Sequence, residues 1–225
     1  MILLAIDTAS ALCAACVYDG AAKKELGRAV LDLGKGHAEH LIGVVHPVMA
    51  QAGVGFDRLE RIAVSVGPGS FTGVRVGVSA ARGFAMALKI PAVGVTTLEA
   101  IAAEAREGFG PRKVMAALDG GRGEVHLAVY DGVGALRFGP VATTLQGAAA
   151  IAREHMPMLV GSAAATVAGE AHAGLELGAK GSTADIGVYA RLGAAKEAGE
   201  KPKPLYLRDA DAKPQAGFVL PRIRS

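Results

Sequence analysis

Two stretches of this chain repeat one another, and the repeat constrains the fold more than any other feature. Residues 2–7 (ILLAID) form an apolar run that ends in Asp7, and residues 114–119 (VMAALD) form another that ends in Asp119. Each run is followed by a short turn, a second apolar run and the same four residues, Val-Tyr-Asp-Gly, at the same spacing. Two apolar runs joined by a short turn predict a β-hairpin. The repeat therefore predicts a duplicated chain with two similar halves.

Helical periodicity and short apolar runs account for the rest of each half. The expected elements are helices over 34–52, 72–88, 98–107, 145–155 and near 186–198, and strands over 62–66, 91–95 and 158–160. Hairpins followed by strand–helix units are typical of an α/β fold with mixed sheets and flanking helices. A Gly/Pro-rich stretch at 108–111 marks the boundary between the halves. We expect one subdomain over 1–107, a smaller and divergent one over 108–208, and a flexible, mildly basic tail over 209–225.

Composition narrows the partners that the chain can have. Its 225 residues suffice for one large domain or two small ones. The net charge of +3 is too mild for a dedicated nucleic-acid binder, and the lack of Trp leaves few platforms for stacked bases. The chain contains no apolar run of about 18 residues, and its start lacks the basic region of a signal peptide. We therefore expect a cytoplasmic protein that does not enter a membrane.

Residues 67–77 (GPGSFTGVRVG) form a glycine-rich link between an expected strand and an expected helix. The link is not a P-loop, because no Lys-Ser/Thr pair follows its last glycine, and its spacing does not fit G-x-G-x-x-G. Gly73 and Gly77 are four residues apart and so lie on one face of the helix. Such a strip permits close approach of another element. That element is either part of the same chain or a partner subunit.

The repeated acidic residues are the next candidates for chemistry. Asp7 and Asp119 each precede a turn of small residues. If they faced one another across a cleft, they could hold a magnesium nucleotide together with Gly69, Gly120 and Gly121. It is equally consistent with the sequence that each aspartate only caps its own turn.

The histidines and cysteines predict no metal site. Of the six histidines, only His37 and His40 share a helix face, and the pattern H-E-x-x-H is absent. We interpret this pair as surface or partner-contact residues. Cys13 and Cys16 form a C-x-x-C pattern, but within an expected strand they point to opposite faces, as ordinary buried thiols would. Ser65 lies inside a strand and not at its turn, which excludes a nucleophile elbow.

Four stretches together resemble the TsaB (YeaZ) family: residues 4–9 (LAIDTA), 37–41 (HAEHL), 67–75 (GPGSFTGVR) and 94–98 (GVTTL). Residues 204–208 (PLYLR) also look like that family, and the match is strong over 1–105 and looser beyond. The resemblance implies the duplicated actin/Hsp70/sugar-kinase (ASKHA) fold, in agreement with the repeat. It also implies a part in making threonylcarbamoyladenosine in tRNA, beside the anticodon, as a non-catalytic subunit.

The resemblance further implies the partners. The paralogue TsaD would transfer the threonylcarbamoyl group, the ATPase TsaE would join the pair, and TsaC would supply the intermediate. The chain would contact tRNA only through this complex and would form a homodimer when alone. It would need no cofactor of its own, with ATP or ADP and metal expected on TsaE and TsaD. Where TsaD has its metal-binding H-x-x-x-H, this chain has Thr97 and Ile101, which cannot replace imidazole ligands. The same absence argues against peptidase activity.

The expected interface with TsaD consists of the helix that begins near residue 37 and the helix that follows the glycine-rich link. Its expected residues are His37, His40, Leu41, Val44, Gly73, Val74, Gly77, Val78, Ala81 and Ala85. An alternative function is an ATPase or small-molecule kinase of the same fold that uses Asp7 and Asp119. The glycine-rich run that follows Asp119 leaves nucleotide binding open. A third possibility is direct tRNA binding through the C-terminal tail.

Overall fold

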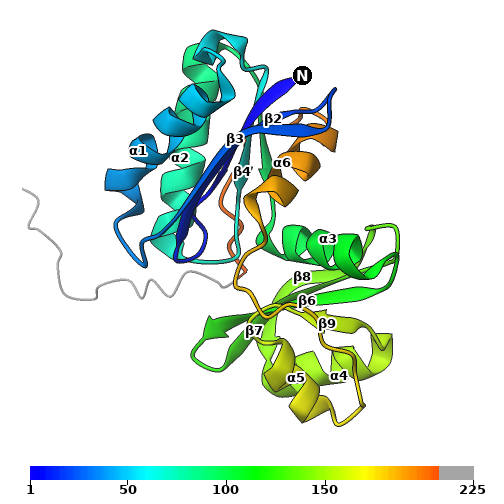
Figure 1. Ribbon diagram of the computed structural model, residues 1–225. Coiled ribbons are helices and arrows are strands. Elements are labelled where there is room, and N and C mark those ends of the chain that lie inside the picture. Colours follow the sequence, from blue (N-terminus) through cyan, green and yellow to red (C-terminus); the bar gives the residue numbers. More distant parts are fainter. Residues whose placement is uncertain (208–225) are drawn as a thin grey trace, which may run out of the picture.

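The computed structural model describes residues 1–207, and its two sheets repeat one plan (Figure 1). The first sheet has the order β3-β2-β1-β4-β5 and the second the order β8-β7-β6-β9. In each sheet a hairpin is antiparallel, and its first strand pairs in parallel with a later strand, β4 or β9. The duplicated α/β fold predicted from the repeat is thus confirmed. The strands are β1 (Ile2–Asp7), β2 (Leu12–Asp19), β3 (Lys24–Asp32), β4 (Arg61–Ser65), β5 (Ala92–Val95), β6 (Val114–Gly121), β7 (Glu124–Tyr130), β8 (Leu136–Thr144) and β9 (Met158–Val160).

Helices cover both faces of each sheet. They are α1 (His37–Ala52), α2 (Phe71–Leu88), α3 (Thr97–Phe109), α4 (Leu145–His155), α5 (Ala164–Ala171) and α6 (Ile186–Ala195), with a short 3-10 turn η1 (Phe56–Arg58). Side-chain caps fix where several of them begin: Ser70, Thr96, Thr144 and Asp185 each accept a backbone N–H from the first turn.

Three apolar cores hold these layers together. The first lies between the helices α1 and α2 and one face of the first sheet. The second lies between the two sheets and contains α3 and α6, and the third joins α4 and α5 to the outer face of the second sheet. The arrangement is visible in Figure 1, where α3 and α6 lie between the sheets. The first and third cores leave the outward faces of α1, α2, α4 and α5 exposed to other molecules.

Two helices pack outside their own half of the sequence. The predicted boundary at 107/108 separates the strands of the first sheet from those of the second. However, α3 packs against β6 and β9, whereas α6 packs against β1, β2 and β4. The chain therefore crosses between the halves more than once, which ties each sheet to both ends of the sequence.

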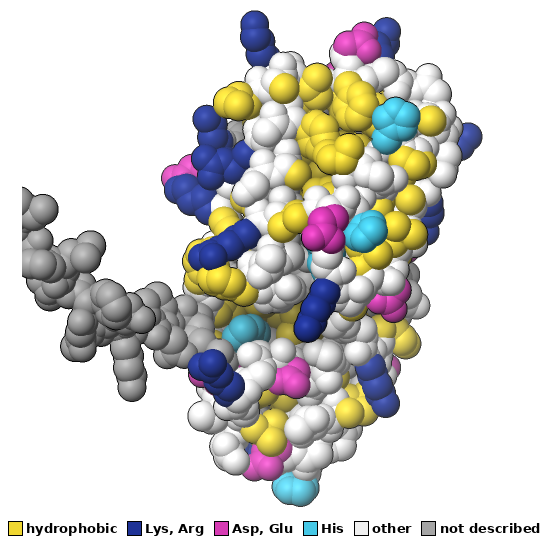
Figure 2. Space-filling model, turned by 90° about the vertical axis from the view of Figure 1, so that its left-hand side faces the viewer, with side chains coloured by type: hydrophobic (Ala, Val, Ile, Leu, Met, Phe, Trp, Pro, Cys, Tyr) yellow, Lys and Arg dark blue, Asp and Glu magenta, His cyan; other side chains and the backbone are white. Residues whose placement is uncertain are grey.

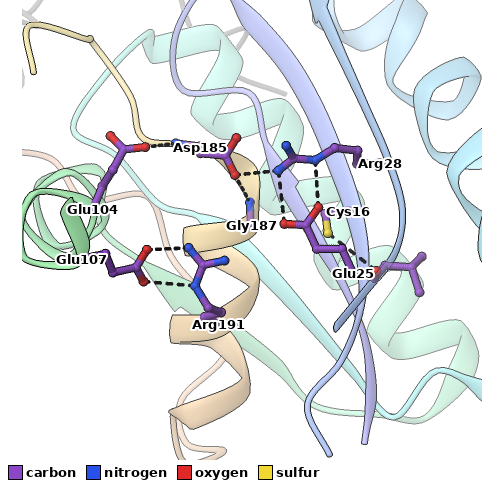
Figure 3. A network of polar contacts seen from close by, with 9 residues as sticks. Cys16, Glu25, Arg28, Glu104, Glu107, Asp185, Gly187 and Arg191 are labelled. Atoms are coloured by element: carbon purple, nitrogen blue, oxygen red, sulfur yellow. Dashed lines mark hydrogen bonds and ion pairs between the residues drawn. The ribbon is translucent and has the colours of Figure 1, made fainter. Parts of the chain in front are cut away.

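A polar network reinforces this crossing (Figure 3). The Arg28 guanidinium of β3 lies 2.6 Å from Asp185 Oδ1 at the start of α6. The backbone N–H of Asp185 donates to Glu104 of α3 at 2.8 Å, and burial raises the pKa of that Glu104 carboxyl. Further along α6, Arg191 donates to both carboxylate oxygens of Glu107, at 3.0 and 2.6 Å. These contacts join α3, α6 and the edge of the first sheet.

The structure differs from the sequence prediction in three elements. Both third strands, β3 and β8, and the helix α5 were not expected. The two strands are sheet edges with much exposed or half-buried surface, so the apolar alternation that marks a strand is weak. The predicted tail over 209–225 lies outside the described residues. Among residues 1–207, none of the helices is both long and apolar enough to cross a bilayer.

Candidate functional site

The glycine-rich link packs against the turn that follows β1. Ser70 donates its backbone N–H to Ala9 O at 2.7 Å, and Thr8 Oγ1 donates to Gly73 O at 2.7 Å. A Cβ atom built on Gly73 would overlap with the carbonyl oxygen of Thr8, and one built on Gly77 would overlap with Thr8 Oγ1. The glycines therefore permit close approach of β1 and its turn, within the same chain.

This finding corrects the orientation expected for the interface residues. Gly73 and Gly77 face inward, so the strip they form is not a surface for a partner. The same is true of most side chains on the two helices that the sequence placed in the interface. Those buried in the core are His37, Leu41, Val44, Val74, Val78 and Ala81, while Ala85 is half-buried and His40 is exposed. Of the predicted set, His40 is exposed, and Leu41, although only 2% exposed, lines the groove between the two helices.

The outward faces of α1 and α2 form a groove between the two helices. The groove has a volume of about 450 Å³ and is lined by Ala38, Leu41, Ile42, Thr72, Arg75, Val76, Ser79 and Ala80. Ile42 is 60% exposed although its side chain is fully apolar. Figure 2 shows hydrophobic side chains gathered on this side of the molecule, over the lobe that contains α1 and α2. An apolar groove with a single charged residue is suited to another protein surface.

The sequence of α2 carries a signal for this groove. On α2, Thr72, Val76 and Ala80 recur at intervals of four, and with Ser79 they line the groove. Side chains four apart lie on one face of a helix, and because none of these is larger than valine, a partner helix could approach closely here. The glycines at 73 and 77 form a clearer pattern on the inward face of the same helix, and that pattern drew the prediction to the wrong face.

Arg75 at the edge of the groove is held by two aromatic rings. Its guanidinium carbon lies 3.6 Å from the centroid of the Phe71 ring and 5.6 Å from that of Tyr206. Its Nε donates to the Tyr206 hydroxyl at 2.8 Å. Tyr206 belongs to the segment 201–207, which we call the strap. The strap is attached to the first sheet because the Leu205 N–H donates to Val66 O at 2.8 Å and Pro202 is buried.

A second cavity, the interlobe cleft, lies between the glycine-rich link and the second sheet. It has a volume of about 340 Å³, and its lining includes Gly69, Asp119 and Gly120, together with the serines at 10, 70, 162 and 182. The structure thus brings together three of the five residues that the sequence proposed for nucleotide binding. Gly121 belongs to the hairpin that follows and is not among the residues that line the cleft.

The two repeated aspartates do not face one another. Asp7 is 1% exposed and accepts hydrogen bonds from the Ala9 N–H at 2.9 Å and from Thr183 Oγ1 at 2.6 Å. Desolvation by burial raises its pKa, against the opposing effect of these hydrogen bonds. Asp119 is exposed, and its Oδ1 accepts the Gly121 N–H at 2.8 Å. Both aspartates therefore cap their own turns, and the expectation of paired carboxylates across a cleft is corrected.

The remaining candidates lie in the core. Thr97 and Ile101 of α3 are 0% and 2% exposed. Cys13 and Cys16 are buried free thiols that belong to different cores, on opposite faces of β2, as the strand periodicity predicted. Burial raises the pKa of Cys13 to about 11 and that of Cys16 to about 12. Within residues 1–207, no group of three or more His, Cys, Asp or Glu side chains is placed to hold a metal ion.

Comparison with known proteins gives one consistent result. The family model for TsaD, tRNA N6-adenosine threonylcarbamoyltransferase, matches residues 32–152. The tRNA threonylcarbamoyladenosine biosynthesis protein TsaB of Escherichia coli is 34% identical over 131 residues, which cover 58% of this chain and 55% of that protein. The chain thus aligns with about half the length of the curated relatives it matches.

Solved structures agree on the architecture. A Pseudomonas aeruginosa protein described as similar to peptidase YEAZ superposes with a TM-score of 0.78 at 26% identity, covering 92% of this chain and 99% of the other. An inorganic polyphosphate/ATP-glucomannokinase from Arthrobacter superposes with a TM-score of 0.51 at 15% identity, covering 86% and 98%. The second likeness concerns the fold alone. It confirms the expectation of a duplicated fold of the sugar-kinase type.

Proposed function

This chain belongs to the TsaD family, of which it is a TsaB-type member, and on that premise we propose that it is a non-catalytic docking subunit for TsaD. In this proposal the α1/α2 groove binds the corresponding helices of TsaD. The pair, joined by TsaE, transfers a threonylcarbamoyl group to the adenosine beside the anticodon of tRNA. The chain itself contacts tRNA only through the complex.

The observation that carries the proposal is the groove. Its lining combines the exposed apolar side chain of Ile42 with Thr72, Val76, Ser79 and Ala80 of the neighbouring helix. Removing apolar surface from water favours association by about 25 cal/mol for each Å² before the entropic cost of joining the two partners is subtracted. The equivalent surface on a second copy of the chain offers the same opportunity, so we also propose a homodimer when TsaD is absent.

Two further observations support a non-catalytic role. The carboxylate of Asp7 is occupied by a turn N–H and by Thr183 Oγ1, inside the core. Where TsaD would have the two histidines of its metal motif, this chain has Thr97 and Ile101, which are core residues without imidazole groups. The chemistry of the complex, including any ATP, ADP and metal, is therefore assigned to TsaD and TsaE in this proposal.

The test is a pair of matched variants, Ile42→Glu and Val133→Glu. Both place a carboxylate on an exposed apolar position, but Val133, 89% exposed, lies in the turn before β8. We expect Ile42→Glu to weaken co-purification with TsaD by roughly thirtyfold or more, because it buries an unpaired charge. The same variant should fail to restore threonylcarbamoyladenosine in tRNA of a strain without its own TsaB, whereas Val133→Glu should restore it. Equal binding by both variants would exclude the groove as the docking surface.

The interlobe cleft supports a second candidate, an ATPase or small-molecule kinase centred on Asp119. In this cleft the Asp119 carboxylate and several serine hydroxyls are accessible together. Calorimetric titration of the isolated chain with Mg-ATP distinguishes the two functions. Tight binding with turnover that is lost in Asp119→Ala would favour the kinase, and the absence of heat and turnover would leave the docking subunit.

A further inference from the structure

Arg75 is the only charged residue among those that line the α1/α2 groove. Phe71 stacks on one side of its guanidinium and the Tyr206 hydroxyl accepts its Nε–H, so the side chain is held in one place. Arginine side chains lose considerable rotamer freedom when they are ordered. Here the Arg75 side chain is already ordered in the unbound chain, so less conformational entropy is lost when a partner binds. We call this arrangement of Phe71, Arg75 and Tyr206 the arginine clamp.

The clamp leaves the positive charge of Arg75 without a counter-charge in the described part of the chain. Elsewhere on the surface, arginines pair with carboxylates: Arg28 with Asp185, Arg112 with Glu176 and Arg191 with Glu107. No carboxylate of residues 1–207 lies within ion-pair distance of Arg75. Its hydrogen bond goes instead to a neutral phenol, which keeps the guanidinium available for an acid.

We propose that Arg75 anchors the docked partner by receiving a carboxylate of that partner at the edge of the groove. The inference rests on the proposed function, because it assumes that a protein fills the groove. A guanidinium presents paired N–H groups that match a carboxylate, and such charge-assisted contacts are stronger than neutral ones. Arginine at the edge of an apolar patch is also a frequent centre of binding energy.

Charge favours a different protein as the occupant over a second copy of this chain. In a twofold dimer the same patch faces itself, so Arg75 would enter the interface twice. The lining of the groove contains no Asp or Glu that could pair with either copy. A different protein that places an acidic side chain opposite Arg75 would pair with its charge and avoid two unpaired arginines in one interface. Arg75 would therefore select hetero-pairing over self-pairing.

The strap makes this anchor depend on the C-terminal part of the chain. Tyr206 follows directly after Leu205, which is hydrogen-bonded to Val66 at the end of β4. The clamp thus links α2 to a segment 131 positions away in the sequence. In this arrangement Tyr206 acts as a positioning residue. It need not touch the partner itself.

The first experiment measures the affinity of the full-length chain for TsaD of the same organism, using Arg75→Glu and Arg82→Glu. Arg82 is exposed on the same helix but does not line the groove. We expect Arg75→Glu to weaken binding by roughly thirtyfold, and Arg82→Glu by less than about threefold. Equal losses would show a general effect of charge, and an unchanged affinity in Arg75→Glu would overturn the anchor.

The control that separates this inference from the proposed function is Ile42→Glu, measured in the same assay. If Ile42→Glu abolishes binding but Arg75→Glu does not, the groove is the docking surface and the anchor is wrong. If neither variant affects binding, the groove is not the docking surface, and if the unaltered chain does not bind TsaD, the docking function itself fails. Sedimentation of the isolated chain tests the competing occupant. Loss of self-association in Arg75→Glu, as large as the loss of TsaD binding, would contradict selective hetero-pairing.

A double-mutant cycle tests the positioning role of Tyr206. We expect Tyr206→Ala to weaken TsaD binding about fivefold, within the usual coupling of contacting residues, and Tyr206→Phe to retain most of the stacking. In the Arg75→Glu background, Tyr206→Ala should have no further effect, since there is no guanidinium left to hold. Additive losses, or a fall in thermal stability that explains them, would refute the clamp.

Discussion

Substituting Gly73 by alanine tests whether the glycine strip serves the fold. A Cβ at this position would overlap with the carbonyl oxygen of Thr8, a backbone atom in a turn that is itself fixed by the hydrogen bond from Thr8 Oγ1 to Gly73 O at 2.7 Å. Because neither backbone can yield without breaking that bond, the strain should be near the upper end of overpacking costs, about 3 kcal/mol. Alanine gains about 1 kcal/mol over glycine in helix propensity. The net loss in the free energy of unfolding is therefore about 2 kcal/mol.

The matched control is Gly83→Ala in the same helix. No atom lies within 4 Å of a Cβ built there, so only the propensity gain applies. For a chain of this size each kcal/mol shifts Tm by about 2–4 °C, which predicts a fall of about 4–8 °C for Gly73→Ala and a rise of about 2–4 °C for Gly83→Ala. Thermal denaturation followed by circular dichroism, with urea titration for the free energies, measures both. If the two variants shift Tm in the same direction, the inward-facing role of Gly73 is wrong.

Three further predictions concern buried and paired groups. Burial raises the pKa of Asp7 in the folded state, so the folded chain retains a proton that the unfolded chain releases above about pH 4. The wild type therefore loses stability as the pH rises, and the stability of Asp7→Asn relative to wild type, measured by urea titration, should rise between about pH 4 and 7. A constant difference would contradict the burial argument. Cys13 and Cys16, with pKa values raised to about 11 and about 12, should resist iodoacetamide at pH 8 in the native chain and react fully once it is unfolded, with mass spectrometry as the readout. Arg191→Ala should cost no more than about 1 kcal/mol of unfolding free energy, because the pair with Glu107 is exposed at both ends; a larger loss in urea would mean that the network is cooperative.

The central strands of both sheets could be predicted because they belong to the sequence repeat. The strands that begin each half, β1 and β6, are apolar runs buried on both sides, and such runs are visible in a single sequence. The edge strand β8 was missed because it includes Gly139 and Pro140 and is mostly half-buried. The short helix α5 was missed because an Ala/Gly-rich segment shows little contrast between its faces.

The sequence predicted which two helices form the candidate site, α1 and α2, but not which face of each helix is turned to the surface. Helical periodicity separates Val74 and Val78 from Val76 and Ser79, yet it does not say which side meets the sheet. The decisive contact is with Thr8, sixty-five positions before Gly73, and no local pattern contains it. The clamp is equally non-local, since Tyr206 reaches Arg75 only after the chain has built the second lobe and returned.

The repeated aspartates show how far two similar local sequences can diverge in chemistry. Both carboxylates accept an N–H two residues on, although the β1/β2 ladder ends at Asp7 and the β6/β7 ladder continues to Gly121. The difference comes from what covers them. The segment that precedes α6 places Thr183 over Asp7, and α6 itself packs against the first sheet. The Asp7 carboxylate is therefore shielded from solvent. Asp119 remains exposed and lines the interlobe cleft. Hydroxyl and amide donors already occupy the Asp7 carboxylate, so a mechanism that needs two carboxylates at the cleft would require the segment that carries Thr183 to leave its place.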